Sequence, residues 1–182
     1  FVVSWRSEGS FGNDNWSRSV QARRFTADGT ALDPVEFQVN AYTPYSQAGP
    51  GVSMASDGGF VVAWTSEVTN GTDTHIGVQA RRFAADGAPL DPEEFQVNVF
   101  TNTGQSGNSV AMNAEGDFVI AWETVGSAGS DQDGSSQARR FRADGTPVDA
   151  LEFQLNTYTT SWQIAPRLAA GPDGDFVAVW AS

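Results

Sequence analysis

The five residues Gln21-Ala22-Arg23-Arg24-Phe25 occur again at 79–83 and at 137–141. The spacing between copies is 58 residues. A repeat of this length indicates that each unit is one supersecondary module, which stacks on its neighbours to bury a core. The chain is therefore expected to be an array of similar modules.

Two other segments repeat with nearly the same spacing. Residues 36–40 (Glu-Phe-Gln-Val-Asn) return at 94–98 and, with Leu in place of Val, at 152–156. An apolar segment ends in tryptophan four times, at Trp5, Trp64, Trp122 and Trp180. We divide the single array over residues 1–182 into units 1–59, 60–117 and 118–175, with a partial fourth unit at 176–182.

The second unit shows what one module contains. Residues 52–55 and 78–83 have the composition of strands, and residues 94–98 alternate polar and apolar side chains in the manner of a half-buried strand. Residues 60–64 (Phe-Val-Val-Ala-Trp) are apolar on both faces, which indicates a strand buried between two layers. Asp86-Gly87 predicts a tight type I′ hairpin.

These elements predict an all-β fold made of four-stranded antiparallel sheets, because no long stretch shows helical periodicity. Such sheets in tandem are typical of β-propeller blades. A propeller closes with about four to eight blades, and the chain has three repeats plus a partial fourth. The alternative is an open β-solenoid-like stack. In either case the apolar strands at both ends should be covered by neighbouring repeats of the same long chain or by other copies.

Composition excludes several classes of partner and site. The net charge is −12, with 22 acidic residues and 10 basic ones, all of them Arg. This charge argues against nucleic acid or an anionic membrane surface as a partner. No apolar run has the roughly 18 residues of a membrane helix, so we expect no membrane insertion. The absence of Cys excludes disulfides and thiolate metal sites.

The residues that repeat are predicted to be structural. The four tryptophans should be core. One arginine of each Arg-Arg pair must point to an otherwise apolar face of its strand and therefore needs a carboxylate or carbonyl partner. We expect repeated ion pairs within or between sheets, with anion or sugar-acid binding as the alternative. The arginines concerned are Arg24, Arg82 and Arg140. The candidate acidic partners form three repeated sets: Glu36, Glu94 and Glu152; Asp28, Asp86 and Asp144; and Asp33, Asp91 and Asp149.

The residues that break the repeat are the candidates for binding. Trp16 and Trp162 lie in loops and have no counterpart in the other units, so they are candidate saccharide-stacking residues. Asp131-Gln132-Asp133-Gly134 resembles the alternating acidic residues of a calcium loop, although the complete EF-hand pattern is absent. Asp14 and Asp73 occupy similar loops. If the protein has a cofactor it should be calcium, and the alternative is that these residues only shape turns.

Three segments together carry a resemblance. They are Asp173 with the strand ending in Trp180, the Gln-Ala-Arg-Arg-Phe segment at 137–141 with its following turn, and Glu-Phe-Gln-Leu-Asn-Thr-Tyr-Thr at 152–159. They resemble a repeat found in tandem in large secreted or surface proteins of bacteria. That resemblance implies an extracellular or cell-surface location and a structural or adhesive role. It transfers no catalytic residue.

From these observations we predict a non-catalytic extracellular repeat scaffold that contacts proteins or glycans. The argument against an enzyme is that catalytic groups are usually singular, whereas nearly every notable residue here occurs three times. Two alternatives remain open. One is a lectin-like propeller that binds carbohydrate, and the other is a fragment of a secreted enzyme whose catalytic residues lie outside this chain or around its one histidine, His75.

Overall fold

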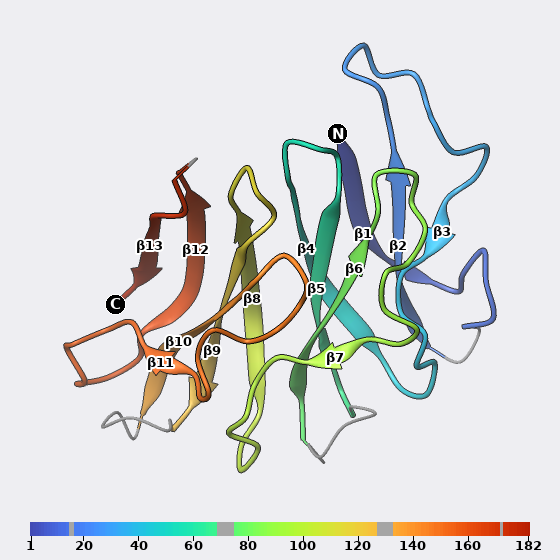
Figure 1. The fold of residues 1–182 in the computed structure, drawn as a ribbon. Helices are drawn as coiled ribbons and strands as arrows, with labels where there is room; N and C mark the ends of the chain where they lie inside the picture. Colours follow the sequence, from blue (N-terminus) through green and yellow to red (C-terminus); the bar gives the residue numbers. More distant parts are fainter. Residues whose placement is uncertain (15–16, 69–74, 127–132, 172) are drawn as a thin grey trace.

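The computed structural model describes residues 1–14, 17–68, 75–126, 133–171 and 173–182 (Figure 1). The described residues form thirteen strands and no helix, and hence no helix with the length and hydrophobicity of a membrane span. The strands are β1 (Val2–Glu8), β2 (Arg18–Arg24), β3 (Phe37–Gln38), β4 (Gln47–Met54), β5 (Phe60–Ser66), β6 (Gly77–Phe83), β7 (Phe95–Gln96), β8 (Gln105–Met112), β9 (Phe118–Val125), β10 (Gly134–Phe141), β11 (Phe153–Gln154), β12 (Ile164–Ala170) and β13 (Phe176–Ala181).

The strands form four antiparallel sheets, which we number in chain order. Sheet 1 has the order β1-β2-β3, sheet 2 β4-β5-β6-β7, sheet 3 β8-β9-β10-β11 and sheet 4 β12-β13. The predicted all-β fold with four-stranded antiparallel sheets is confirmed. The sheets are offset from the sequence units, because the first strand of each complete sheet comes from the preceding unit: β4, for example, lies before the boundary at residue 60.

The sheets lie face to face around a common axis. Strands β4, β8 and β12 are each the first strand of a sheet and contact one another in turn, so they form the inner edge of the array. Figure 1 shows the sheets side by side in chain order, with the short strands β7 and β11 on a different edge from β4 and β8. We call the face that a sheet turns to the preceding sheet its back face, and the other its front face.

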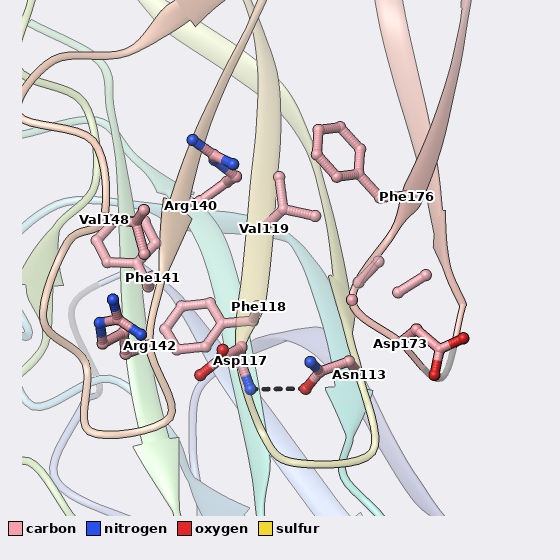
Figure 2. Close-up of a pocket in the computed structure, with 13 residues that line it drawn as sticks. Asn113, Asp117, Phe118, Val119, Arg140, Phe141, Arg142, Val148, Asp173 and Phe176 are labelled. Carbon is pink, nitrogen blue, oxygen red and sulfur yellow. Dashed lines mark hydrogen bonds between the residues drawn. The ribbon is translucent and has the colours of Figure 1, made fainter.

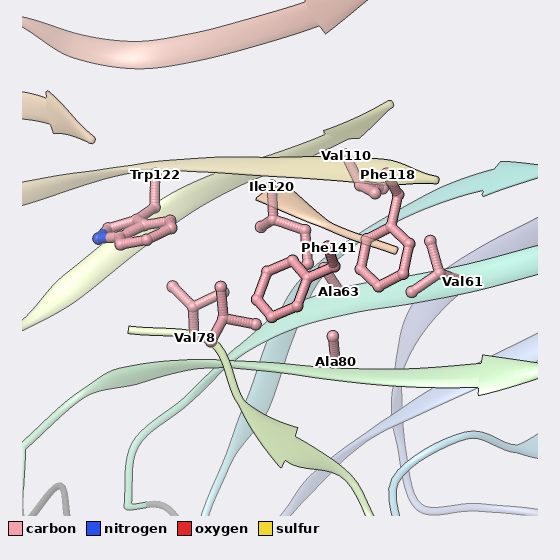
Figure 3. Packing of buried hydrophobic residues seen from close by; sticks show 10 residues of the cluster. Val61, Ala63, Val78, Ala80, Val110, Phe118, Ile120, Trp122 and Phe141 are labelled. Carbon is pink, nitrogen blue, oxygen red and sulfur yellow. The ribbon is translucent and has the colours of Figure 1, made fainter. Parts of the chain in front are cut away.

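The cores lie between the sheets, which explains why β5 and β9 are apolar on both sides. Residues 60–64 are at most 1% exposed, because side chains alternate between the front and back faces and both faces are covered. Between sheets 2 and 3, Val61 and Ala63 from the front of one pack against Ile120 and Trp122 from the back of the next (Figure 3). This is the arrangement predicted for a strand between two layers.

The hairpin that follows β6 differs from the prediction. Gly87 has a φ of 86°, but Asp86 is not in the positive-φ region, whereas a type I′ turn requires positive φ at both central residues. The loop is longer instead. The Ala84 N–H donates to the Ala88 carbonyl at 2.8 Å, and the Ala84 carbonyl accepts from the Gly87 N–H at 2.9 Å. The Asp86 side chain accepts from the Ala88 N–H at 2.9 Å. The same pattern recurs at Gly29 and Gly145.

The tryptophans predicted to be core differ according to their sheet. Trp64 and Trp122 are fully buried, but Trp180 is 37% exposed and Trp5 is half-buried. Trp180 lies on β13, which in the described structure pairs only with β12 and has no third strand beside it. Trp5 lies on the back face of sheet 1, where no described sheet precedes it. The prediction that all four are buried is therefore wrong for these two.

Candidate functional site

The second arginine of each Arg-Arg pair forms an ion pair with an aspartate of its own unit, which is one of the candidate partners named above. Asp149 accepts from the Arg140 backbone N–H at 3.0 Å and pairs with its guanidinium at 2.8 Å. Asp33 and Asp91 bind Arg24 and Arg82 in the same way. Hydrogen bonds from Arg140 hold the pKa of Asp149 below its ordinary value.

The repeated glutamates accept from backbone groups of the preceding sheet. Both carboxylate oxygens of Glu94 bind backbone N–H groups, at 2.9 Å to Ala41 and 2.9 Å to Tyr42. Glu152 does the same one sheet later, at 3.0 Å to Val99 and 2.8 Å to Phe100. These carboxylates therefore hold neighbouring sheets together.

Two arginines complete each junction. The Nη1 group of the first arginine of a pair donates to a carbonyl of the preceding sheet, and that of the second arginine donates to a hairpin carbonyl of the following sheet. These arginine contacts and the glutamate contacts of the preceding paragraph are together called the junction contacts. The arginine contacts are Arg24 to Ala85 at 2.7 Å, Arg81 to Val39 at 2.9 Å, Arg82 to Ala143 at 2.8 Å and Arg139 to Val97 at 2.9 Å.

The predicted loop sites are only partly described. Trp16, Asp73 and Asp131 lie outside the described residues. Trp162 is 52% exposed, and its indole lies so close to Gly134 that a Cβ there would be 2.3 Å from the ring. One face of this indole is thereby occupied by backbone, and the remainder stays accessible to a ligand.

The acidic candidates lie apart. Asp14 is buried, and one of its oxygens accepts from the Asn40 side chain at 2.8 Å. Asp133 contributes its backbone carbonyl to a hydrogen bond from Gly126 at 2.6 Å. Within the described part of the chain no group of three or more acidic, His or Cys residues could hold a metal ion. Calcium binding at Asp131 and Asp133 stays a prediction.

Within the described residues, the His75 ring contacts the backbone of another loop. Its Nδ1 lies 3.1 Å from the carbonyl oxygen of Thr101, in the connection to β8. This contact links the two loops on either side of it.

The site that sequence reasoning missed lies on the axis. Residues 49–52 of β4, residues 107–110 of β8 and Arg167 of β12 line a hollow of about 410 Å³, which we call the axial pocket. Each of the three strands has a bulge there, with positive φ at Gly49, Gly107 and Ala165. The bulges break the regular pairing and so re-aim the side chains that follow.

Two positions that line the axial pocket differ between the units. At one position the three units have Pro50, Asn108 and Pro166, and at the next they have Gly51, Ser109 and Arg167. These differences become visible when the three units are aligned on their inner strands, rather than on the segments that repeat most clearly. Asn108 and Arg167 lie within strands, whereas the residues that break the repeat conspicuously, such as Trp16 and Trp162, lie in loops.

Asn108 has a buried polar atom that faces no described partner. Its Nδ2 donates to the Gly49 carbonyl at 3.2 Å and lies 3.4 Å from the Thr65 hydroxyl. The residue is 9% exposed, and its Oδ1 has no hydrogen-bond partner among the described residues. A buried acceptor without a donor is costly, so a ligand hydroxyl here would be stabilising.

Arg167 supplies a cation to the same pocket. It is exposed, and its Nη1 donates to the Pro166 carbonyl at 2.9 Å. In the described part of the chain no carboxylate pairs with it, unlike Arg24, Arg82 and Arg140. A guanidinium in this state presents several N–H donors to a ligand.

Glu123 braces the wall of the pocket. Its carboxylate accepts from the Ser106 hydroxyl at 3.0 Å and from the Ala165 N–H at 2.8 Å, so it joins the bulges of β8 and β12. The equivalent residue is Thr65 on β5 and Arg6 on β1. Glu123 lies behind Gly107, and no carboxylate lines the pocket itself among the described residues.

A second hollow lies between sheets 3 and 4, at the opposite end of the strands. Its volume is about 280 Å³, and Figure 2 shows Val119, Arg140 and Phe176 around it. The equivalent hollow between sheets 2 and 3 is about 90 Å³ and includes the hairpin residue Ala143. The polar residues of the larger hollow include Asn113 and Arg142, and within the described part of the chain neither has a buried atom without a partner, as Asn108 has.

No protein-family model matches the sequence, and no curated protein is similar to it in sequence. Two solved structures share the fold. A Hadza microbial sialidase is similar over 92% of this chain and 39% of its own, with a TM-score of 0.52 and 12% identity. An α-L-arabinanase of Penicillium chrysogenum, solved with arabinobiose, is similar over 98% of this chain and 52% of its own, with a TM-score of 0.58 and 11% identity.

These similarities confirm the predicted fold: the chain consists of β-propeller-type blades, and it spans about half or less of the length of the two structures. They contradict the prediction that the chain is not an enzyme, because both neighbours are named as enzymes. That prediction rested on the triple occurrence of notable residues. The repeated residues build the junctions, whereas Asn108 and Arg167 of the axial pocket have no residue of the same type at the equivalent positions of the other units.

Proposed function

We propose that this chain is part of an extracellular β-propeller that binds a saccharide in its axial pocket. The observation that carries the proposal is the gathering of unrepeated polar side chains where the inner strands meet. A buried amide oxygen of Asn108 without a described donor and an unpaired guanidinium of Arg167 line one pocket. Saccharide hydroxyls both donate and accept hydrogen bonds, so they match this pair of groups.

The similar structures support a carbohydrate ligand. One is a sialidase and the other an arabinanase complexed with arabinobiose. Propellers enclose a central channel, and the axial pocket lies where that channel would be. The extracellular location rests on the resemblance of the repeat to those of secreted and surface proteins.

Hydrolysis of the bound saccharide is the activity to test beside binding. Most glycoside hydrolases use a pair of carboxyl groups on either side of the scissile bond. Glu123 lies beside the pocket wall, and its two hydrogen bonds to β8 and β12 give it a bracing role. A hydrolytic site would need carboxylates from further blades.

Calorimetric titration with arabinobiose and with a sialylated oligosaccharide tests the proposal. At least one of them should bind, and Arg167→Ala and Asn108→Ala should each weaken binding by about tenfold, the effect of losing a hydrogen bond to a charged or buried group. Arg142→Ala is the matched control, because Arg142 is exposed at the hairpin end of sheet 3. If neither saccharide binds and a wider glycan array is also negative, the proposal is wrong. Product analysis of the same mixtures reports hydrolysis.

A further inference from the structure

A third hollow lies between sheets 1 and 2, at the end of the molecule where β2 and β4 begin. Its volume is about 460 Å³, and we call it the loop-end pocket. The described residues that line it are all polar, and they are Glu8, Ser17, Arg18, Ser46 and Glu67. Because no apolar side chain lines the pocket among the described residues, a hydrophobic ligand has nothing to pack against here.

The two other junctions have an apolar contact at the same position. The counterparts of Arg18 and Ser46 are Ile76 and Gly104 between sheets 2 and 3, and Gly134 and Trp162 between sheets 3 and 4. A Cβ at Gly104 would lie 3.6 Å from the Cβ of Ile76, and a Cβ at Gly134 would lie 2.3 Å from the indole of Trp162. In each case a large apolar side chain lies against a glycine. The polar lining of the loop-end pocket is therefore a departure from the repeat.

Ser46 gives the loop-end pocket a buried hydroxyl. The residue is 4% exposed, and it lines the pocket. Its backbone is held by Glu67: the Ser46 N–H donates to the Glu67 carboxylate at 3.3 Å, and the Ser46 carbonyl accepts from the Glu67 N–H at 3.0 Å. No described group bonds to the Ser46 hydroxyl. A buried hydroxyl without hydrogen bonds is costly, so a polar ligand group here would be stabilising.

Arg18 and Glu67 give the same pocket charges of both signs. The Arg18 guanidinium lies 4.0 Å from the Glu8 carboxylate, and the two side chains are 42% and 83% exposed, so this ion pair is loose. The positive charge of Arg18 disfavours a metal cation in the pocket. A guanidinium donates hydrogen bonds and a carboxylate accepts them, whereas a hydroxyl does both. The combination therefore suits a ligand that carries many hydroxyl groups.

The loop-end pocket and the axial pocket lie along one strand. Ser46 directly precedes β4, and the lining of the axial pocket begins at Gly49 of that strand. Three residues of a strand span about 10 Å. An oligosaccharide that follows β4 can therefore contact both pockets.

We propose that the loop-end pocket is a second saccharide subsite, which binds a further unit of the oligosaccharide held in the axial pocket. This inference rests on the proposed function and narrows its ligand to an oligosaccharide longer than a disaccharide. The Ser46 hydroxyl and the Arg18 guanidinium donate to oxygens of the added unit, and the Glu67 carboxylate accepts from one of its hydroxyls.

The length of the ligand is the variable that tests this subsite. In calorimetric titration, arabinobiose is compared with a longer arabino-oligosaccharide, and a short sialylated oligosaccharide with a longer one. In the native chain the longer ligand of at least one pair should bind about tenfold more tightly, the gain from one hydrogen bond to a charged group. The double variant Arg18→Ile, Ser46→Gly should reduce this ratio of affinities to about one. Glu115→Ala is the control and should keep the native ratio, since Glu115 is exposed in a hairpin.

The fold should tolerate the double variant, because both replacements are the residues of the second unit at the equivalent positions. Circular dichroism during heating checks this. Ser46→Ala removes the hydroxyl alone and should lower the ratio in part, so it tests the subsite even where the double variant fails to fold.

The outcomes separate the subsite from the proposed function. If Asn108→Ala weakens the binding of a short ligand but the longer ligand binds the native chain no more tightly, the loop-end subsite is wrong and the axial pocket stands. A folded double variant that keeps the native ratio leads to the same conclusion. If no ligand of either pair binds, the proposed function fails, and the subsite fails with it.

Discussion

Asp149 shows what a single repeated residue contributes to its sheet. Its carboxylate receives three hydrogen bonds from Arg140, one from the backbone N–H and two from the guanidinium. Because these bonds favour the charged form, the pKa of Asp149 lies below its ordinary value of 3.8. A carboxylate with a lowered pKa stabilises the fold above that ordinary value, and the contribution is lost as the pH falls through the lower, folded-state pKa.

Asp149→Asn should accordingly destabilise the protein at neutral pH by about 1 kcal/mol, the order expected for a partly exposed ion pair with hydrogen bonds. The difference between variant and native protein should shrink as the pH falls below 3.8. Urea unfolding at a series of pH values measures both effects. Asp173→Asn, at an exposed residue, should show neither. A deficit for Asp149→Asn that is the same at all pH values would contradict the role given to its charge.

At the scale of the element, the bulges of the inner strands shape the axial pocket. Gly49 and Gly107 occupy equivalent positions in β4 and β8 and have nearly the same φ, 59° and 63°. Their surroundings differ, because a Cβ at Gly107 would lie 2.9 Å from Cδ of Glu123, whereas nothing lies within 4 Å at Gly49. An alanine would thus be strained by the positive φ at both positions, and it would meet a steric clash only at Gly107.

Gly49→Ala should therefore cost about 1–2 kcal/mol, the cost of a left-handed conformation for a residue with a Cβ. Gly107→Ala should cost more, and it should also weaken saccharide binding, since Glu123 must move away from Ser106 and Ala165. Urea unfolding and calorimetric titration of the two variants provide the comparison. Equal losses of stability in both would show that Glu123 adapts without cost.

At the scale of the whole molecule, the position of a sheet in the array decides what its tryptophan contributes. Trp122 lies between two complete sheets and is fully buried, whereas Trp180 lies in sheet 4 and is 37% exposed. In a repeat array, stability comes from each unit and from its contacts with its neighbours. An identical residue should thus contribute less to the stability of the described chain where no described strand covers it.

Trp122→Ala should reduce the free energy of unfolding by roughly 3–5 kcal/mol, the usual cost of removing a buried aromatic side chain. Trp180→Ala should cost clearly less. Chemical denaturation followed by circular dichroism measures the two losses. The outcome that would count against the described packing is a loss at Trp180 as large as that at Trp122.

The sequence by itself determined the fold of this protein: the 58-residue repeat, the alternation of residues 94–98 and the two-sided apolar strands are local patterns, and local patterns predict strands and their stacking. The axial pocket was decided by tertiary structure alone. Asn108, Glu123 and Arg167 are far apart in the sequence, and nothing in their own segments indicates that they meet. They are brought together by the succession of inner strands around one axis, which depends on contacts between sheets rather than on any single segment. The same reason explains the junctions, where the partner of each repeated glutamate lies 52 to 53 residues away on another sheet.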